Sequence, residues 1–367
     1  MLIPRGPLCR QSRHPVAANA DTLADRFAAL SVVASLVEHD GRPVQIQHQF
    51  VTADAARGIV PSARVGTEKV AFLPVAEGDT DITKSEIQRG ENSFVDFRIA
   101  GHLDAAKAVI EALSAAGFVD IAIAAEFVMS EDDADRLAQG LLKASDSPRA
   151  VISGSGPTRT LKEGQSFNEA RILNGFGTEI WRQKKLWPAG ITRSLATAYG
   201  LSDPGIGMLI EDSASGDQVF VADADALGRC VVFICQDLQA RPLTEDILRM
   251  YQPDWVFIPV MDYGVESSRW THRRSAELSS VSQARFLVSS SLTLARWLKM
   301  DPLPPCGMAM GPAAPAYGDG GRVEDDERAV AFASVDPAST PGFSVVVWRS
   351  GTWERTNVST SAPALSA

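Results

Sequence analysis

The spacing of apolar residues changes along the chain and predicts an alternation of strands and helices. Residues 44–50 alternate apolar and polar positions, as in a strand buried on one face. Residues 70–75 form a continuous apolar run, which is typical of a strand covered on both faces. After a polar loop, apolar residues recur at helical spacing over 102–116, and the run at 121–125 predicts the next strand. This order indicates an α/β fold.

The same alternation continues beyond residue 130. Helices are predicted at 131–144 and 243–251, and a loop at 187–210. Further strands are predicted at 150–153, 170–173, 180–186, 219–222, 231–234, 255–258 and 286–288. A core built from many strands with interspersed helices can bring residues from distant segments to one end of a sheet.

The two ends of the chain differ from this core. Residues 1–21 show no apolar period, which is typical of a mobile leader, and Thr22 has the character of an N-cap for an amphipathic helix. The Ser/Thr-rich residues 351–367 indicate a flexible C-terminal tail. We therefore expect an N-terminal extension of unknown role at 1–65 and one main domain at 66–350.

Composition narrows the class of protein. The 367 residues are 45% hydrophobic and 22% charged, as in a globular domain. The net charge of −10 argues against nucleic acid or anionic lipid as a partner and favours a small-molecule substrate. No run of about 18 apolar residues predicts a membrane span, and the N-terminus lacks the apolar core of a secretory signal, so we expect a cytoplasmic protein.

The number and spacing of the cysteines argue against disulfide cross-links. Cys9, Cys230, Cys235 and Cys306 form no CxxC pair and are too few for a disulfide framework in a chain of this length. A structural zinc site is not expected either, and no motif calls for a cofactor or a metal.

Cys235 has the position of a nucleophile. The apolar strand in GRCVVFICQDL runs directly into Cys235, and polar residues then break the run. A thiol at such a strand-to-helix turn lies at the rim of the sheet, where the N–H of Gln236 can point at a developing oxyanion. The alternative is that Cys235 is simply a small buried hydrophobic residue.

A cysteine nucleophile needs a base, because its free pKa is about 8.5. None of the five histidines has the flanking pattern of a papain-like protease. Glu126, at the carboxyl end of the strand at 121–125, is a carboxylate in a position typical of active sites in α/β folds.

Three segments make a resemblance specific. AIAAEF, WRQKKLWP and GRCVVFICQDL resemble the Glu, Lys and Cys motifs of the carbon-nitrogen hydrolase (nitrilase-like) superfamily and occur in that family's order. The similarity spans about residues 66–350 and leaves 1–65 outside. The chain departs from the family in having Ala125 where Pro usually precedes the glutamate, and Gln236 where an aromatic residue often follows the cysteine.

The resemblance implies a catalytic trio. Glu126 would take the thiol proton, Cys235 would attack, and Lys185 would stabilise the anion together with the N–H of Gln236. Glu211 would be a second glutamate that orients the lysine or the substrate, with an exposed loop glutamate as the alternative.

The position of the catalytic lysine needs a choice. If the family's lysine motif is aligned without a gap from Leu186, Gln183 falls at the position of the catalytic lysine. Lys185 is preferred, because it shares one strand face with Trp181 and Gln183, and Lys184 is the alternative. Asp237 is expected to accept backbone N–H bonds rather than to react.

The implied fold is a four-layer α-β-β-α sandwich with two mixed sheets, assembled as a homo-oligomer. The implied activity is hydrolysis of a non-peptide carbon-nitrogen bond in a small amide, carbamoyl or nitrile compound through a cysteine thioester. Two alternatives remain: a catalytically silent scaffold or interaction protein with this fold, and an acyltransferase that uses the same thioester. The substrate, and the choice between amidase and nitrilase, stay open.

Overall fold

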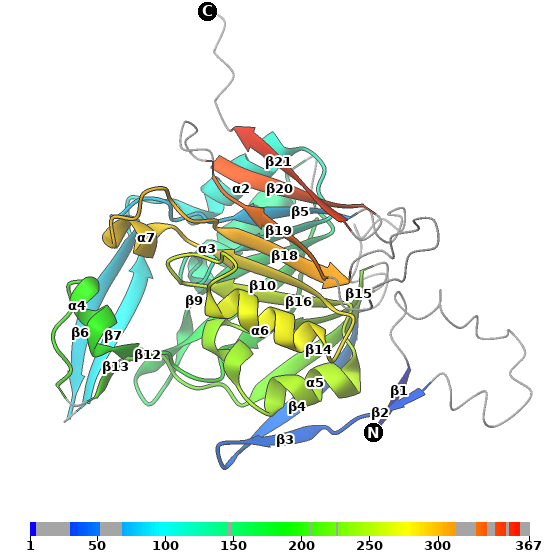
Figure 1. The fold of residues 1–367 in the computed structure, drawn as a ribbon, viewed down its shortest axis with the longest axis horizontal. Coiled ribbons are helices and arrows are strands. Elements are labelled where there is room, and N and C mark those ends of the chain that lie inside the picture. Colours follow the sequence, from blue (N-terminus) through cyan, green and yellow to red (C-terminus); the bar gives the residue numbers. More distant parts are fainter. Residues whose placement is uncertain are drawn as a thin grey trace, which may run out of the picture.

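The computed structural model shows two large mixed sheets with helices around them (Figure 1). It describes residues 1–4, 30–51, 68–90, 92–144, 148–205, 207–224, 227–312, 328–335, 342–349 and 352–359. Within these ranges the strands form sheets of eight, seven, four and two strands. The predicted α/β class with two mixed sheets is confirmed.

The seven-stranded sheet has the order β11-β10-β9-β8-β5-β20-β21. Its strands are β5 (Lys69–Leu73), β8 (Ile121–Ala124), β9 (Ala150–Lys162), β10 (Gln165–Asn174), β11 (Glu179–Lys184), β20 (Gly342–Arg349) and β21 (Thr352–Ser359). The central strands β5, β8 and β9 are parallel, and the outer pairs are antiparallel. Residues 352–359 therefore form an edge strand where the sequence predicts a flexible tail, and 360–367 lie outside the described residues.

The eight-stranded sheet has the order β19-β18-β17-β16-β15-β14-β4-β3. Its strands are β3 (Leu36–His39), β4 (Arg42–Val51), β14 (Gln218–Ala224), β15 (Gly228–Val232), β16 (Trp255–Val260), β17 (Arg285–Ser290), β18 (Gly307–Pro312) and β19 (Arg328–Ala333). The strands β15, β16 and β17 are parallel, so their carboxyl ends meet at one edge of the sheet.

Burial alternates along the central strands of the seven-stranded sheet. Val70 and Phe72 of β5 pack in the core that also contains the residues of the eight-stranded sheet. Ala71 and Leu73 pack in a second core, together with helices α2 (Ala105–Ala116) and α3 (Glu131–Leu141). The continuous apolar run at 70–75 therefore reflects a strand buried on both faces, as its pattern predicts.

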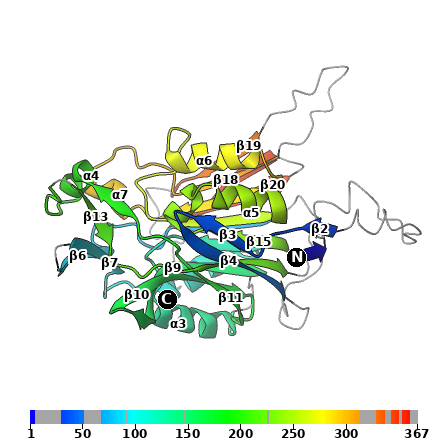
Figure 2. The ribbon, with the colours of Figure 1, turned by 90° about the horizontal axis from the view of Figure 1, so that it is seen from below.

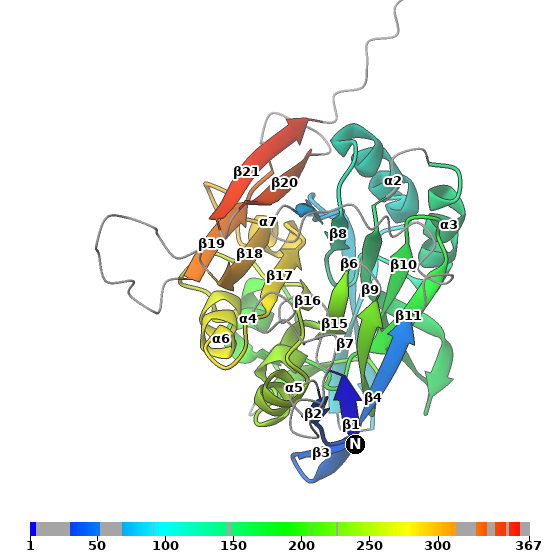
Figure 3. The ribbon, with the colours of Figure 1, turned by 90° about the vertical axis from the view of Figure 1, so that its right-hand side faces the viewer.

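Helices cover the outer sides of both sheets. Figure 3 shows α2 and α3 outside the seven-stranded sheet, and α5 (Leu243–Tyr251) and α6 (Trp270–Ser279) outside the eight-stranded sheet. Figure 2 shows α3 on the side of the molecule opposite to α5 and α6. The apolar residues Leu243, Ile247 and Leu248 of α5 belong to the core between the sheets and this helix layer. No helix in the described ranges has both the length and the apolar character that crossing a membrane requires.

Two segments predicted as loops form a small sheet of their own. Its order is β12-β13-β7-β6, at the left of Figure 1. The strands are β6 (Ile82–Arg89), β7 (Asn92–Ile99), β12 (Gly190–Thr192) and β13 (Met208–Glu211), with helix α4 (Arg193–Ala198) between the last two. The loop predictions fail here because β6 has apolar side chains only at Ile82 and Ile87 and is largely exposed.

Part of the N-terminal extension belongs to the main sheet. The strand β4 pairs in parallel with β14 over seven residues, with Gln45 opposite Gln218, so the strand predicted at 44–50 lies inside the fold. The helix predicted from Thr22 is not formed at its end, because Leu30–Val32 is strand β2, paired with β1 (Leu2–Pro4). The remainder of the predicted helix and of the leader, residues 5–29, lies outside the described residues.

Candidate active site

Three strand ends bring Glu126, Lys185 and Cys235 together. Glu126 follows β8, Lys185 follows β11, and Cys235 lies just beyond β15. The Glu126 and Lys185 residues are each 1% exposed, and Cys235 is 8% exposed. The two predicted charged residues therefore share one buried centre with the predicted nucleophile.

The Glu126 carboxylate is held by donors from three segments. Its Oε1 accepts hydrogen bonds from Nζ of Lys185 at 2.8 Å and from Nδ2 of Asn168 at 3.0 Å. Its Oε2 accepts the backbone N–H of Met261, directly after β16, at 2.9 Å. The carboxylate is thus fixed in orientation by groups that cannot move independently of the two sheets.

Lys185, rather than Lys184, occupies the centre. Nζ of Lys185 donates to Glu126 and also to Oε2 of Glu211. Nζ of Lys184 instead lies over the ring of Phe167, 3.9 Å from its centroid. Successive residues of a strand point to opposite faces, which explains the separation of the two lysines.

Glu211 lies at the end of β13 and is 2% exposed. Its Oε2 accepts the N–H of Ala189 at 3.0 Å as well as the Lys185 ammonium, and its Oε1 accepts the hydroxyl of Ser213 at 2.7 Å. The alternative of an exposed loop glutamate does not apply, because the side chain is buried and bound to the lysine.

Asn168 belongs to the site, although the sequence predicts no role for it. Its Nδ2 donates to Oε1 of Glu126 at 3.0 Å and to Oε1 of Glu211 at 3.2 Å, and its carbonyl accepts the N–H of Lys185 at 2.8 Å. It links all three charged residues. Its position on β10 next to β11 follows from the strand pairing, which the local sequence does not specify.

Cys235 has a backbone conformation typical of a nucleophile at a sharp turn. Its φ of 49° lies in the left-handed region, which is uncommon for residues other than glycine. It begins the 3-10 helix η1 (Cys235–Gln239). The side chain of Gln236 is exposed, so its predicted contribution would come from the backbone N–H alone.

Burial and charge set the protonation of the centre. Burial raises the pKa of the Cys235 thiol well above its usual value; the Glu126 charge and a hydrogen bond to Glu126 raise it further, while Lys185 lowers it. Burial also raises the pKa of Glu126, against the effect of Lys185. Burial lowers the pKa of Lys185, but the charges of Glu126 and Glu211 outweigh this and raise it. The resting centre therefore has a neutral thiol beside an ion-paired carboxylate.

Asp237 accepts backbone hydrogen bonds, as predicted, but from an unexpected segment. Its carboxylate accepts the N–H of Leu186 at 3.0 Å and the N–H of Trp187 at 3.1 Å. Those donors directly follow Lys185 in the chain. Asp237 therefore ties the lysine segment to the turn that carries Cys235.

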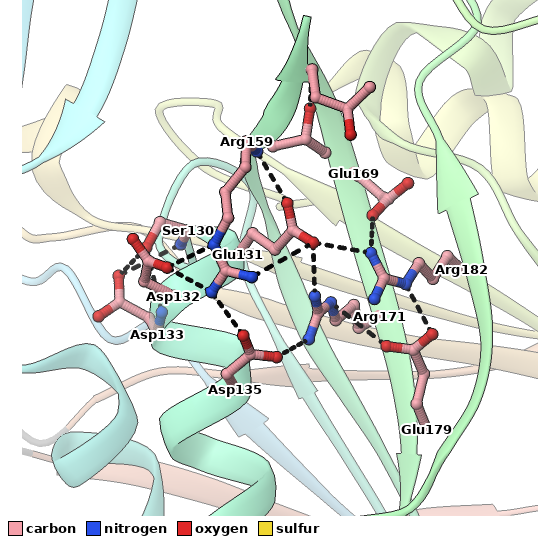
Figure 4. A network of polar contacts seen from close by, with 12 residues as sticks. Ser130, Glu131, Asp132, Asp133, Asp135, Arg159, Glu169, Arg171, Glu179 and Arg182 are labelled. Atoms are coloured by element: carbon pink, nitrogen blue, oxygen red, sulfur yellow. Dashed lines mark hydrogen bonds and ion pairs between the residues drawn. The ribbon is translucent and has the colours of Figure 1, made fainter.

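An ion-pair network supports the strands of the lysine and the asparagine from outside. Figure 4 shows the carboxylate of Glu131, at the start of α3, between the guanidinium groups of Arg171 on β10 and Arg182 on β11. The nitrogen–oxygen distances are 2.9 and 3.0 Å, and Arg182 also contacts Glu169 at 3.2 Å. These contacts hold β10 and β11 against α3.

The structure shows the state of three cysteines and of the possible metal ligands. In the described ranges, Cys230, Cys235 and Cys306 are buried and form no disulfide, and no cluster of three His, Cys, Asp or Glu side chains could hold a metal ion.

Comparisons with known proteins give structural likeness at low sequence identity. No family model matches the chain, and no curated protein matches it in sequence. Nit3 of Saccharomyces cerevisiae, a member of branch 10 of the nitrilase superfamily, is similar with a TM-score of 0.44 and 13% identity, over 80% of this chain and 90% of Nit3.

A second similar structure is an amidase from Nesterenkonia sp., with a TM-score of 0.40 and 13% identity, over 62% of this chain and 78% of the amidase. A mutant of that amidase, with the acetamide moiety of fluoroacetamide on its active-site cysteine, has a TM-score of 0.42 and 11% identity over 81% of this chain and 92% of its own. The chain thus resembles nitrilase-superfamily structures, and the chemistry of its site rests on its own geometry.

Proposed function

We propose that the protein hydrolyses a carbon-nitrogen bond in a small amide, carbamoyl or nitrile compound through a thioester on Cys235. The observation that carries this proposal is the contact set of Glu126: its carboxylate bonds the Lys185 ammonium at 2.8 Å and also interacts with the Cys235 thiol. A base that bonds a cation and interacts with a nucleophile meets the requirements for acyl transfer.

In the acylation half-reaction, Glu126 accepts the proton of the thiol as Sγ of Cys235 forms a bond to the substrate carbon. Proton transfer and attack occur together, because the raised pKa of the thiol keeps free thiolate scarce. The carbonyl electron pair moves to oxygen, and the resulting anion is stabilised by the Lys185 ammonium and the N–H of Gln236.

Collapse of this anion breaks the carbon-nitrogen bond. The amine or ammonia leaves with the proton that Glu126 returns, and a thioester remains on Cys235. Glu126 then removes a proton from water as the water oxygen attacks the thioester, and the thiol is regenerated with release of the carboxylic acid. The raised pKa of Glu126 makes its carboxylate a stronger base for both transfers.

The finer architecture that fits this proposal is a four-layer α-β-β-α sandwich, with Glu126 after the inner strand β8, Cys235 after the inner strand β15 and Lys185 after the edge strand β11. The homo-oligomer and the catalytic roles of the individual residues are part of the same proposal. Sedimentation equilibrium on the full chain would test the oligomer.

The test of function uses matched cysteine variants. The full chain is incubated with a panel of small primary amides, carbamoyl compounds and nitriles, and ammonia release is measured for the unchanged protein, Cys235→Ala and Cys306→Ala. Loss of turnover in Cys235→Ala alone, with unchanged circular dichroism, supports the proposal, because Cys306 is also buried but lies elsewhere in the fold.

Hydroxylamine added to the reaction separates the remaining alternatives. Formation of a hydroxamate that depends on Cys235 demonstrates a thioester. Transfer to added amines in preference to water would replace hydrolysis by acyl transfer. Absence of turnover on the whole panel, with a folded protein and no thioester, would favour a catalytically silent scaffold.

A further inference from the structure

A second carboxyl group lies at the same edge of the sheet as the nucleophile and has no role in the reaction described above. The loop after β16 begins with Met261, whose N–H bonds Glu126, and continues with Asp262. Because β15 and β16 are parallel, with Val232 opposite Phe257, the segments that carry Cys235 and Asp262 emerge at the same edge of the sheet. The Asp262 charge also raises the pKa of Cys235.

One oxygen of the Asp262 carboxylate, Oδ1, accepts hydrogen bonds, whereas the other, Oδ2, accepts none from the described residues. Its Oδ1 accepts the guanidinium of Arg269 at 2.5 Å and the N–H of Tyr263 at 2.8 Å, while its own N–H donates to the hydroxyl of Ser290 at 3.1 Å. The residue is 7% exposed, yet no hydrogen bond from the described residues reaches the buried Oδ2. Burial raises the pKa of Asp262, whereas the charge of Arg269, the N–H of Tyr263 and the nearby Trp270 side chain oppose this rise.

The partner of Asp262 is itself held in place. The guanidinium of Arg269 lies over the ring of Tyr263, 3.4 Å from its centroid, which fixes its plane. Arg269 and the N–H of Tyr263 therefore both bond Oδ1, and the buried Oδ2 has no hydrogen-bond donor among the described residues. An acceptor that is buried without a donor is costly in the free protein, and a ligand N–H that reaches it removes this cost.

The charges around the thiol favour one class of ligand. The carboxylates of Glu126 and Glu211 pair with the ammonium of Lys185, and the carboxylate of Asp262 pairs with the guanidinium of Arg269. Acidic groups outnumber basic ones, so a ligand carboxylate is repelled and a ligand ammonium is attracted. The oxyanion of the reaction itself is met by Lys185.

We propose that Asp262 determines substrate specificity: its free Oδ2 accepts an N–H from the substrate, and the site selects amides that carry an ammonium or amino group over amides that carry a carboxylate. This inference rests on the proposed function, because it assigns the substrate class of the same site. A site that hydrogen-bonds a substrate group discriminates strongly against analogues that lack it.

The first test needs no turnover. Three alkylating reagents of similar size and different charge are compared on the full chain: 2-bromoethylammonium, iodoacetamide and iodoacetate. The rate of Cys235 labelling is followed by mass spectrometry with peptide mapping and divided by the rate of each reagent with glutathione. We expect a corrected preference for the cationic over the anionic reagent of about 10-fold or more.

Substitutions then assign the preference to Asp262. Asp262→Asn is expected to lower the ratio of cationic to anionic labelling about 10-fold. Arg269→Met, which removes a positive charge, is expected to raise it and serves as a second variant if Asp262→Asn does not fold. Glu111→Gln on α2 also removes one carboxylate but lies at an exposed helix position, and its ratio should not change.

The outcomes separate this inference from the proposed function. An unchanged ratio in both Asp262→Asn and Arg269→Met, or failure of all three reagents to label Cys235, overturns the specificity role even if hydrolysis is found. Where hydrolysis is found, 4-aminobutyramide should exceed succinamate in kcat/KM, and Asp262→Asn should reduce that ratio. Charge-selective labelling without turnover on any amide would overturn the proposed function and leave the recognition by Asp262 standing.

Discussion

Nζ of Lys185 lies 2.8 Å from Oε1 of Glu126, and both residues are 1% exposed. Removing two charges from water costs several kcal/mol for each ion, and only their mutual attraction and further hydrogen bonds offset this cost. Glu211 and Asn168 provide those further bonds. The pair therefore makes the fold sensitive to the loss of either charge.

Lys185→Met should destabilise the protein strongly. It leaves the buried carboxylates of Glu126 and Glu211 without their cation, and breaking a buried pair in this way typically costs about 3–5 kcal/mol. Urea denaturation followed by circular dichroism measures the free energy of unfolding. The matched control is Lys107→Met on α2, where the lysine is exposed and lies 3.6 Å from Glu111; we expect a change within about 0.5 kcal/mol. Equal effects of the two substitutions would contradict a buried ion pair at Lys185.

Glu126→Gln should change turnover and thiol reactivity in opposite directions. Turnover should fall about 10²–10⁴-fold, because the base that accepts the thiol proton is lost. The Glu126 charge raises the pKa of Cys235, so its removal should lower that pKa and speed alkylation by iodoacetamide at a given pH. Ammonia release and the pH dependence of alkylation measure the two effects. A parallel loss of both would mean that Glu126 maintains the structure around the thiol rather than acting as the base.

Asp237 should make stability fall as pH rises from about 4 to about 7. Burial raises the pKa of Asp237 to about 7 in the folded protein, against an ordinary value of 3.8, although Lys185 and backbone N–H groups oppose the shift. A carboxyl with a raised folded-state pKa stabilises the fold while it is protonated. This contribution is fully present below about pH 4 and is lost as pH rises through about 7. It amounts to on the order of 4 kcal/mol at most.

The comparison of the unchanged protein with Asp237→Asn isolates this effect from other titrations. The amide does not titrate, so the stability of the unchanged protein relative to Asp237→Asn should decrease between pH 4 and 7 and stay constant above. Urea denaturation at intervals of half a pH unit would show this. A difference that is flat, or that grows with pH, would mean that Asp237 is ionised in the folded protein throughout the range.

The sequence identifies the reacting groups better than the groups that hold them. Glu126 and Cys235 end apolar strands, and that pattern is local, so it is visible in the residues themselves. Asn168 and Asp262 reach the site only because β10 pairs with β11 and β16 pairs with β15. Such pairings join residues far apart in the chain, and no single segment encodes them.

The difference between local patterns and long-range pairing also explains which parts of the fold the sequence predicts wrongly. The strands predicted from continuous apolar runs are present, since burial on both faces leaves a clear signal. The hairpin of β6 and β7 was missed because its strands are half exposed and carry charged side chains between the apolar ones. Asp237 was correctly predicted to accept backbone N–H groups, but its donors come from Leu186 and Trp187, about fifty positions earlier.

Gly154→Ala should disturb the segment that carries Glu126. Gly154 has a φ of 81°, and a Cβ there would lie 2.2 Å from the carbonyl oxygen of Ala125, far inside van der Waals contact. Gly164 in the β9–β10 turn has the same φ of 81°, but the nearest atom to its Cβ would be Nη1 of Arg89 at 3.5 Å. Both alanine variants face the left-handed penalty of about 1–2 kcal/mol. Only Gly154→Ala must also relieve a backbone clash, and the clash is with the residue directly before Glu126.

We therefore expect Gly164→Ala to lower the free energy of unfolding by about 1–2 kcal/mol with turnover within about 2-fold. Gly154→Ala should lose more stability and at least about 10-fold in turnover, because a misplaced base is ineffective even when the fold survives. Urea denaturation and ammonia release on both variants give the comparison. Equal turnover in the two variants would show that the Ala125 carbonyl can shift without moving the Glu126 carboxylate, and the tight contact at Gly154 would then matter for packing alone.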